Sequence, residues 1–276
     1  MFQSSTAILI VASTTISAIA ADTVFNGNRH SERQAVEISY TVDPHENIEN
    51  SAFLKNAPIL LQAAGRLRQS PIVVELYQSQ GCSSCPPANL ALNTIASNPN
   101  VIALNFSVTY WDRLGWKDIF GDEAYTQRQV DYARTLRERS VYTPQVVING
   151  TRAIVGNRPG ELKQAVSKSR KIYGGPSITS KAGQVVISKT NNKQRNTKVW
   201  MVRYDPRTVN VAIKTGENGG RTLPHKNIVR ELKDMGYWTG SAKNISLPKA
   251  GNKKWKTVIL VQNMGTGKIL SAAKIS

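Results

Sequence analysis

From Pro71 onward, the apolar and polar positions of the chain follow strand and helix periods in turn. Uninterrupted apolar runs predict buried strands at 72–77 and 101–108, and apolar positions at helical spacing predict a helix at 82–97 between them. A second helix is expected at 122–138, with basic residues at its end, where the helix dipole favours them. This part of the chain therefore has the predicted order strand, helix, strand, helix.

The segment that follows has the pattern of a β-hairpin and a helix. Residues 141–156 read as two short strands joined at Asn149-Gly150, and Asn-Gly is the strongest short hairpin signal. Pro159 then opens a helix, because proline is tolerated in a first helical turn. We therefore expect a βαβ unit followed by a ββα unit over residues 71–174.

Gly174-Gly175-Pro176 has the composition of a linker. After it, the pattern changes to short runs of alternating apolar and polar positions. Such runs predict strands. They lie at 184–189, 198–204, 209–214, 256–261 and 269–275. One segment among them, 228–236, is expected to be a helix or a loop. Residues 176–276 are therefore predicted to form a small β-rich, sandwich-like domain that is packed on or tethered to the first.

The first seventy residues divide into an apolar start and a polar remainder. Residues 7–19 are apolar but too few to span a bilayer, and an A-x-A-like cleavage site follows at 18–22. We expect a signal peptide at 1–21, although residues 1–6 lack the usual Lys or Arg, and hence a periplasmic or secreted protein without a transmembrane anchor. Residues 22–70 are polar with weak periodicity and are predicted to form a partly ordered arm.

The charge of the chain is strongly and unevenly positive. The 276 residues carry a formal net charge of +18 at pH 7, and residues 176–276 hold 19 Lys and Arg against 4 Asp and Glu, which accounts for +15 of it. Such a field attracts polyanions such as nucleic acid, anionic lipid headgroups or cell-wall polymers. A lysine-rich, solvated surface explains the same composition and is the favoured interpretation. We expect weak binding to anionic surfaces at most, and no specific nucleic-acid site.

The candidate chemistry lies in Cys82 and Cys85, the two cysteines of the chain. They stand at C-x-x-C spacing directly after the predicted strand 72–77. A disulfide across so short a loop removes little entropy from the unfolded chain, so stability is a poor reason for it. The spacing favours a redox pair or a metal clip, and outside the cytoplasm such a pair meets an oxidising environment.

Two separate signals make residues 71–174 similar to the thioredoxin fold. One is the C-x-x-C between a strand and a helix, and the other is Thr143-Pro144 at the start of the next-but-one strand. Proline cannot donate to a sheet ladder, so at a strand start it marks an edge or a tight turn. In thioredoxin-like proteins this position is a cis proline that faces the cysteines. The resemblance implies an α/β thioredoxin-like domain, followed here by the β-rich C-terminal domain.

Longer motifs within residues 71–276 resemble a bacterial secreted family known as domain of unknown function 1223. These motifs are Val74–Ala88 around the cysteines, Tyr110–Asp118, Tyr142–Gln145 and Gly216–Asn227. The chain departs from the family pattern at Asn89 and Thr109, where the family favours an acid, and at Ser107, where it favours a histidine. These departures remove the groups that a proton relay at these positions would need. The family has a predicted fold and no settled activity, so the resemblance implies architecture more than substrate.

Thiol chemistry suggests a role for each site residue. Cys82 would stand at a helix N-terminus, where N–H groups and the dipole stabilise a thiolate and bring its pKa to ~3.5–7.5, against ~8.5 for a free cysteine. We assign Cys82 as the nucleophile and Cys85, three residues on, as the resolving thiol. Thr143 and Pro144 would face the pair, and the Thr143 backbone would bind an extended substrate segment as an added strand.

For some other residues near the motifs, the sequence leaves more than one role open. Glu75, on the strand that leads to the cysteines, is either a buried proton acceptor for Cys85 or a residue that faces water at a strand edge. Trp111 and Trp116 follow the second strand, and packing is favoured over substrate contact for both. We expect His225 to be a surface or packing residue rather than a metal ligand.

Three functions remain open from the sequence. The first is an exported thiol-disulfide oxidoreductase that uses Cys82 and Cys85 on protein thiols or disulfides, without a cofactor. The second is a copper(I)-handling protein in which the two thiolates are soft ligands for a soft ion. The third is a non-enzymatic envelope- or polyanion-binding module, whose basic C-terminal domain acts and whose disulfide only closes a turn. We expect the first, with cysteine-containing proteins as partners.

Overall fold

The computed structural model describes residues 15–21, 35–41, 69–181, 183–191 and 193–275. The chain divides into two compact units, 1–64 and 65–276. In the first unit, β1 (Thr15–Ala21) pairs antiparallel with β2 (Ala35–Thr41). Most of the predicted signal peptide and of the predicted arm lies outside the described residues, and both remain predictions. Within the described residues, no helix combines the length and the apolar character needed to cross a membrane.

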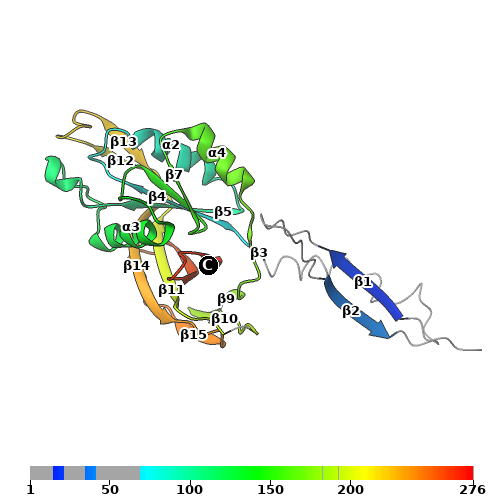
Figure 1. Ribbon diagram of the computed structural model, residues 1–276. Coiled ribbons are helices and arrows are strands. Elements are labelled where there is room, and N and C mark those ends of the chain that lie inside the picture. Colours follow the sequence, from blue (N-terminus) through cyan, green and yellow to red (C-terminus); the bar gives the residue numbers. More distant parts are fainter. Residues whose placement is uncertain (1–14, 22–34, 42–68, 182, 192, 276) are drawn as a thin grey trace, which may run out of the picture. The chain divides into compact units, whose positions relative to one another are not determined.

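The second unit is built on one eight-stranded mixed sheet (Figure 1) with the strand order β17-β16-β11-β14-β5-β4-β6-β7. Its strands are β4 (Ile72–Gln78), β5 (Val101–Ser107), β6 (Gln145–Ile148), β7 (Arg152–Val155), β11 (Thr197–Asp205), β14 (Ile228–Tyr237), β16 (Lys256–Asn263) and β17 (Ile269–Ile275). β4 pairs parallel with β5 and antiparallel with β6. Strands from both sides of the predicted linker at 174–176 join this sheet, so the two sequence regions share it.

Helices and short strands surround this sheet. The helices are α2 (Pro86–Ile95), α3 (Glu123–Leu136), α4 (Pro159–Lys168) and the 3-10 turn η2 (Asp112–Leu114). The short strands are β3 (Gln69–Ser70), β8 (Ile172–Tyr173), β9 (Ile178–Lys181), β10 (Gln184–Ile187), β12 (Val209–Ala212), β13 (Thr222–His225) and β15 (Lys243–Ser246). The prediction of a mixed α/β fold is confirmed, and it has a large sheet and few helices.

The large sheet has two faces that different elements cover. On one face α3 places Tyr125 and Tyr132 against apolar side chains from both sequence regions, namely Val73, Tyr77, Leu104, Phe106, Val202 and Leu260. On the opposite face, α2 and α4 cover one half through a core of Val74, Leu76, Leu92, Ala103, Leu162 and Val166. The small sheet β15-β10-β9 covers the other half through Val185, Ile187, Val199, Met201 and Ile259. Side chains that alternate between strand faces thus supply separate cores.

The predicted Asn-Gly hairpin is confirmed between β6 and β7, which pair antiparallel. Asn149 and Gly150 have positive φ angles of 50° and 68°, as a tight hairpin turn of this kind requires. A Cβ atom at Gly150 would lie 1.9 Å from the carbonyl oxygen of Gly267, so only glycine fits there. The carbonyl of Asn149 also accepts a hydrogen bond from Ile269 N at 3.0 Å. The hairpin is therefore fixed to the C-terminal strand.

The segment 228–236, predicted as a helix or a loop, is a strand, and that prediction is wrong. It forms most of β14, which lies between β11 and β5 in the sheet. Its register against β11 shifts twice, between Lys198 and Trp200 and between Arg203 and Tyr204. Such bulges insert an extra residue and reverse the side-chain alternation, so the sequence of β14 lacks a strict period of two.

A buried ion pair joins the large sheet to α3. Glu75 on β4 has no exposed surface, and its Oε1 atom accepts a hydrogen bond from Arg128 Nε at 2.8 Å. Tyr132 OH donates to the other carboxylate oxygen at 2.5 Å, and Arg128 Nη1 donates to Gln262 Oε1 at 3.0 Å. Burial would lower the pKa of Arg128, but the neighbouring carboxylate raises it above its ordinary value. Arg128 therefore keeps its positive charge inside the core, and both members of the pair are hydrogen-bonded there.

Arg128→Met should lower the free energy of unfolding by about 3–5 kcal/mol, because it leaves the Glu75 carboxylate buried without its cation. The exposed pair of Arg134 and Asp131 provides the control, and Arg134→Met should cost less than about 1 kcal/mol. Urea unfolding of both variants measures the difference. Equal losses in the two variants would contradict this account of the pair.

Candidate functional site

Cys82 and Cys85 form a disulfide in the turn between β4 and α2, with their Cα atoms 5.5 Å apart. Neither cysteine has exposed surface, whereas Ser83 and Ser84 between them are exposed. The Cys85 N–H donates to the Cys82 carbonyl at 3.2 Å, which closes the turn. The site is thus a buried disulfide beneath an exposed pair of serines.

The predicted helix 82–97 begins too early, because α2 starts at Pro86 with Cys85 as its N-cap residue. Proline is favoured at the first helical position, which explains the later start. Cys82 therefore does not stand at an exposed helix N-terminus, and that expectation is wrong. Its sulfur lies 3.4 Å from Ser84 Oγ instead.

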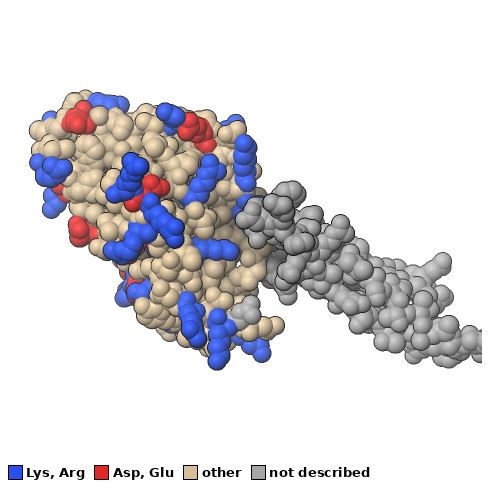
Figure 2. Space-filling model, in the orientation of Figure 1, with Lys and Arg blue, Asp and Glu red and all other residues tan. Residues whose placement is uncertain are grey.

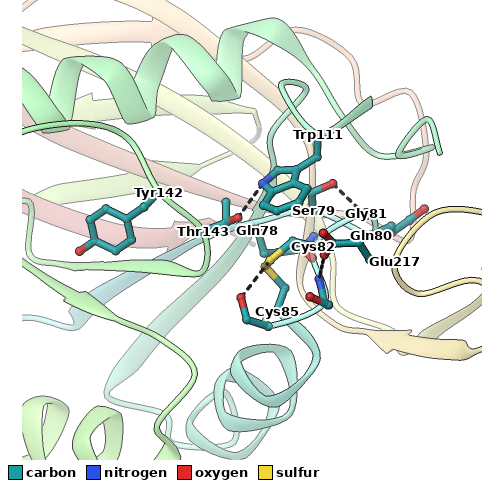
Figure 3. The surroundings of a disulfide bond; sticks show 12 residues. Gln78, Ser79, Gln80, Gly81, Cys82, Cys85, Trp111, Tyr142, Thr143 and Glu217 are labelled. Carbon is teal, nitrogen blue, oxygen red and sulfur yellow. Dashed lines mark hydrogen bonds between the residues drawn. A yellow bond between two sulfur atoms is a disulfide. The ribbon is translucent and has the colours of Figure 1, made fainter. Parts of the chain in front are cut away.

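A loop from the C-terminal region covers the cysteine turn (Figure 3). We call residues 215–221, between β12 and β13, the cap loop. Glu217 Oε2 accepts a hydrogen bond from Ser83 N at 3.1 Å. Asn218, which has no exposed surface, donates through Nδ2 to the carbonyls of Gln80 and Cys82, both at 2.9 Å. The Gly-rich segment 216–220 predicts a loop, but no local pattern predicts that it lies against the cysteines; its other signal in the sequence was the resemblance carried by Gly216–Asn227.

Two tryptophans hold the neighbouring segments in place. Trp111 Nε1 donates to Thr143 Oγ1 at 2.7 Å, and Trp116 Nε1 donates to Gln80 Oε1 at 2.9 Å. Trp116 also packs against the apolar cluster of the β12–β13 hairpin. Both indoles are half-buried, and both donate their N–H groups to other residues of the protein. This agrees with the packing interpretation of these residues.

The Thr143–Pro144 peptide bond is cis, as predicted, and Thr143 lies beside Cys82 (Figure 3). The carbonyl of Tyr142 accepts a hydrogen bond from Gln129 Nε2 at 2.7 Å, and that of Pro144 accepts one from Gly156 N at 2.8 Å. Among the described residues, the backbone N–H and C=O of Thr143 have no hydrogen-bond partner. A segment next to the disulfide therefore offers one free donor and one free acceptor.

Buried neutral side chains lie below the first turn of α2. The network joins Gln78 Nε2 to Ser107 Oγ at 2.8 Å, Asn89 Nδ2 to Gln78 Oε1 at 3.1 Å, and Asn105 Nδ2 to Asn89 Oδ1 at 2.7 Å. Asn89 N also donates to the Cys85 carbonyl at 3.1 Å. The network thus connects the end of β4 to the cysteine turn, and through the side chain of Ser107 it reaches the buried carboxyl group of Asp118.

The position of Glu75 matches neither of the two roles that the sequence left open, a proton acceptor for Cys85 or a residue that faces water. Its full burial excludes the water-facing alternative. Its hydrogen-bond partners are Arg128 and Tyr132 on α3, on the sheet face opposite to α2. Among the described residues, the carboxylate thus has no contact with Cys85 that would support proton transfer.

Two further titratable groups near the site are buried. Asp118 accepts hydrogen bonds from Gln80 N at 2.8 Å and from Phe120 N at 2.9 Å, and burial raises its pKa to about 6. His225 packs edge-on against Phe120, and burial lowers its pKa to about 4, so it is neutral at pH 7. His225 is thus a packing residue, which is one of the two roles that we expected for it from the sequence. Among the described residues, no three or more His, Cys, Asp or Glu side chains gather as a metal site.

Asp118→Asn should remove a pH dependence of stability. The folded pKa of Asp118, about 6, lies above the ordinary value for an unfolded chain, so ionisation costs stability as the pH rises through this range. Between pH 4 and pH 7, the free energy of unfolding of the natural protein should fall by about 2–3 kcal/mol relative to that of the variant. Urea unfolding at several pH values tests this, and parallel curves for the two proteins would refute it.

Comparison with known proteins places the chain in a family. The crystal structure of protein AGR_C_4864 from Agrobacterium tumefaciens is 30% identical, with a TM-score of 0.58, and the match covers 74% of this chain and 92% of that one. HBP35 of Porphyromonas gingivalis is similar in fold alone, at 10% identity and a TM-score of 0.52 over 75% of each chain. No curated protein matches the chain. Residues 73–262 match the family described as protein of unknown function (DUF1223), and this chain belongs to that family.

Proposed function

We propose that this protein is an exported thiol-disulfide oxidoreductase with a thioredoxin-like core, acting on the cysteines of other proteins. The observation that carries the proposal is the Cys82–Cys85 disulfide at the end of a central strand, beside the free backbone groups of Thr143. A disulfide that closes so short a loop adds little stability, so its use in exchange chemistry explains it better.

The arrangement of strands supports the thioredoxin-like core. β4 and β5 are parallel neighbours, and α2 connects them in the sequence. β6 and β7 form an antiparallel hairpin on the other side of β4. Helix α4 follows the hairpin and packs with α2 on one face of the sheet. The cysteine turn follows β4, and Thr143-Pro144 leads into β6. These elements bring the two sequence signals together at one end of neighbouring strands.

The proposed exchange reaction uses the sulfur atoms of both cysteines. A substrate thiolate attacks Cys82 Sγ and forms a mixed disulfide, while the Cys82–Cys85 bond breaks and Cys85 leaves as a thiolate that takes up a proton. A second substrate thiolate then attacks the substrate sulfur of the mixed disulfide, which releases substrate disulfide and Cys82 as a thiolate. Two electrons pass from the substrate to the protein, and the reduced pair reverses these steps with a substrate disulfide.

The surroundings support Cys82 as the attacked sulfur. Cys85 is the N-cap of α2, and its carbonyl is held by Asn89 N. Cys82 instead lies in the turn, between Thr143 and the cap loop (Figure 3). An extended substrate segment that pairs with the N–H and C=O of Thr143 would present its sulfur on this side.

The basic surface supports a second candidate, a module that binds anionic polymers or membranes. Lys and Arg side chains are spread over the face seen in Figure 2, where acidic side chains are few. In that case the disulfide would only close a turn. Copper(I) handling has less support, because it rests on the two sulfurs alone.

Cys85→Ala should trap partner proteins as mixed disulfides through Cys82, because the resolving thiol is missing. Envelope extracts are incubated with the reduced variant, and non-reducing gels with mass spectrometry identify the adducts. Cys82→Ala is the matched control and should trap far fewer partners. If neither variant traps a protein, the oxidoreductase proposal fails and the anionic-surface module takes its place.

A further inference from the structure

Glu217 brings a negative charge to the cysteine turn of a protein whose net charge is strongly positive. Its side chain is exposed, and its carboxylate accepts a hydrogen bond from the amide that directly follows Cys82. Hydrogen bonding by Ser83 lowers the pKa of Glu217 below its ordinary value, so the group is ionised at neutral pH. A thiol that approaches Cys82 therefore meets a fixed anion.

No cation neutralises this charge within the described part of the chain. Glu217 forms no ion pair there, and the nearby Arg221 donates to Asn218 Oδ1 at 2.7 Å instead. Other acidic groups of the same region are compensated, since Glu231 pairs with Arg203 and Asp205 pairs with Arg207. The field of Glu217 thus acts on an incoming group.

The cap loop holds Glu217 in this position. Asn218 is buried and donates to two carbonyls of the cysteine segment. Thr215 Oγ1 donates to the Gly115 carbonyl at 2.5 Å, and Gly220 N donates to Ile213 O at 2.8 Å. The backbone on both sides of Glu217 is therefore anchored, although its side chain faces solvent.

We infer that Glu217 is a specificity-determining residue, which disfavours anionic thiols such as glutathione and favours thiols carried by neutral or cationic partners. The inference rests on the proposed thiol-disulfide exchange at Cys82. In that step a thiolate RS⁻ attacks Cys82 Sγ, an RS–Cys82 bond forms, and Cys85 leaves with the electron pair of the broken disulfide. Charge on R changes the energy of approach past Glu217, while the bonds that form and break stay the same.

The test compares three small thiols of different charge as reductants of the full, oxidised protein: glutathione (anionic), 2-mercaptoethanol (neutral) and cysteamine (cationic). Rates are measured by rapid alkylation of the released thiols and mass spectrometry. Glu217→Gln should raise the ratio of the glutathione rate to the cysteamine rate about threefold to tenfold over that of the natural protein, as expected for removing one nearby charge. Glu217→Lys should raise the ratio further.

Asp234→Asn on β14 is the control, since it removes one negative charge outside the cap loop and should leave the ratio unchanged. A ratio that stays the same in Glu217→Gln and Glu217→Lys overturns the inference, and so does an equal rise in the control. If none of the three thiols reduces the native disulfide in any variant, the exchange reaction itself is excluded and the proposed function fails with it.

Discussion

The structure depends on the seam where β5 meets β14, because this pairing joins the two sequence regions into one sheet. Asn105 and Ile228 are partners in a parallel register. Asn227 strengthens the contact, since its carbonyl accepts from Asn105 N at 3.0 Å and its side chain donates to the Ala103 carbonyl at 2.9 Å. Parallel pairing of distant segments needs a long connection, and here that connection carries the β12–β13 hairpin. The seam thereby fixes where the cap loop can lie.

The placement of the cap loop changes how the cysteine pair is understood. A C-x-x-C at an exposed helix N-terminus would be open to any thiol, whereas Cys82 and Cys85 are covered and bordered by Glu217 and Asn218. Selection of partners by the cap loop thus fits the geometry better than unselective exchange with any thiol.

Local sequence signals predicted the elements that local interactions determine. The apolar run of β4 and the Asn149-Gly150 turn gave a strand and a hairpin that are confirmed. β14 was missed because its two register shifts destroy the alternation on which a strand prediction depends. The start of α2 was misplaced, since the turn at Cys82 has no periodicity of its own.

The site was also predictable only in part, because some of its contacts join residues that are far apart in the sequence. Cys82, Cys85 and Thr143-Pro144 carry chemistry that is readable from residue type and spacing. The hydrogen bond from Asn218 to the Gln80 carbonyl instead joins residues 138 positions apart. Such a contact is set by sheet topology, and topology is not encoded in a local pattern. The face on which Glu75 lies was likewise decided by where α3 packs.

The reduction potential of the Cys82–Cys85 pair distinguishes a disulfide used in exchange from a structural disulfide. The protein is equilibrated in glutathione and dithiothreitol redox buffers, and alkylated thiols are counted by mass spectrometry. A disulfide used in exchange should titrate as one two-electron couple between about −270 and −120 mV, the range of known exchange proteins. A potential below about −300 mV, which is typical of structural disulfides, would contradict the account.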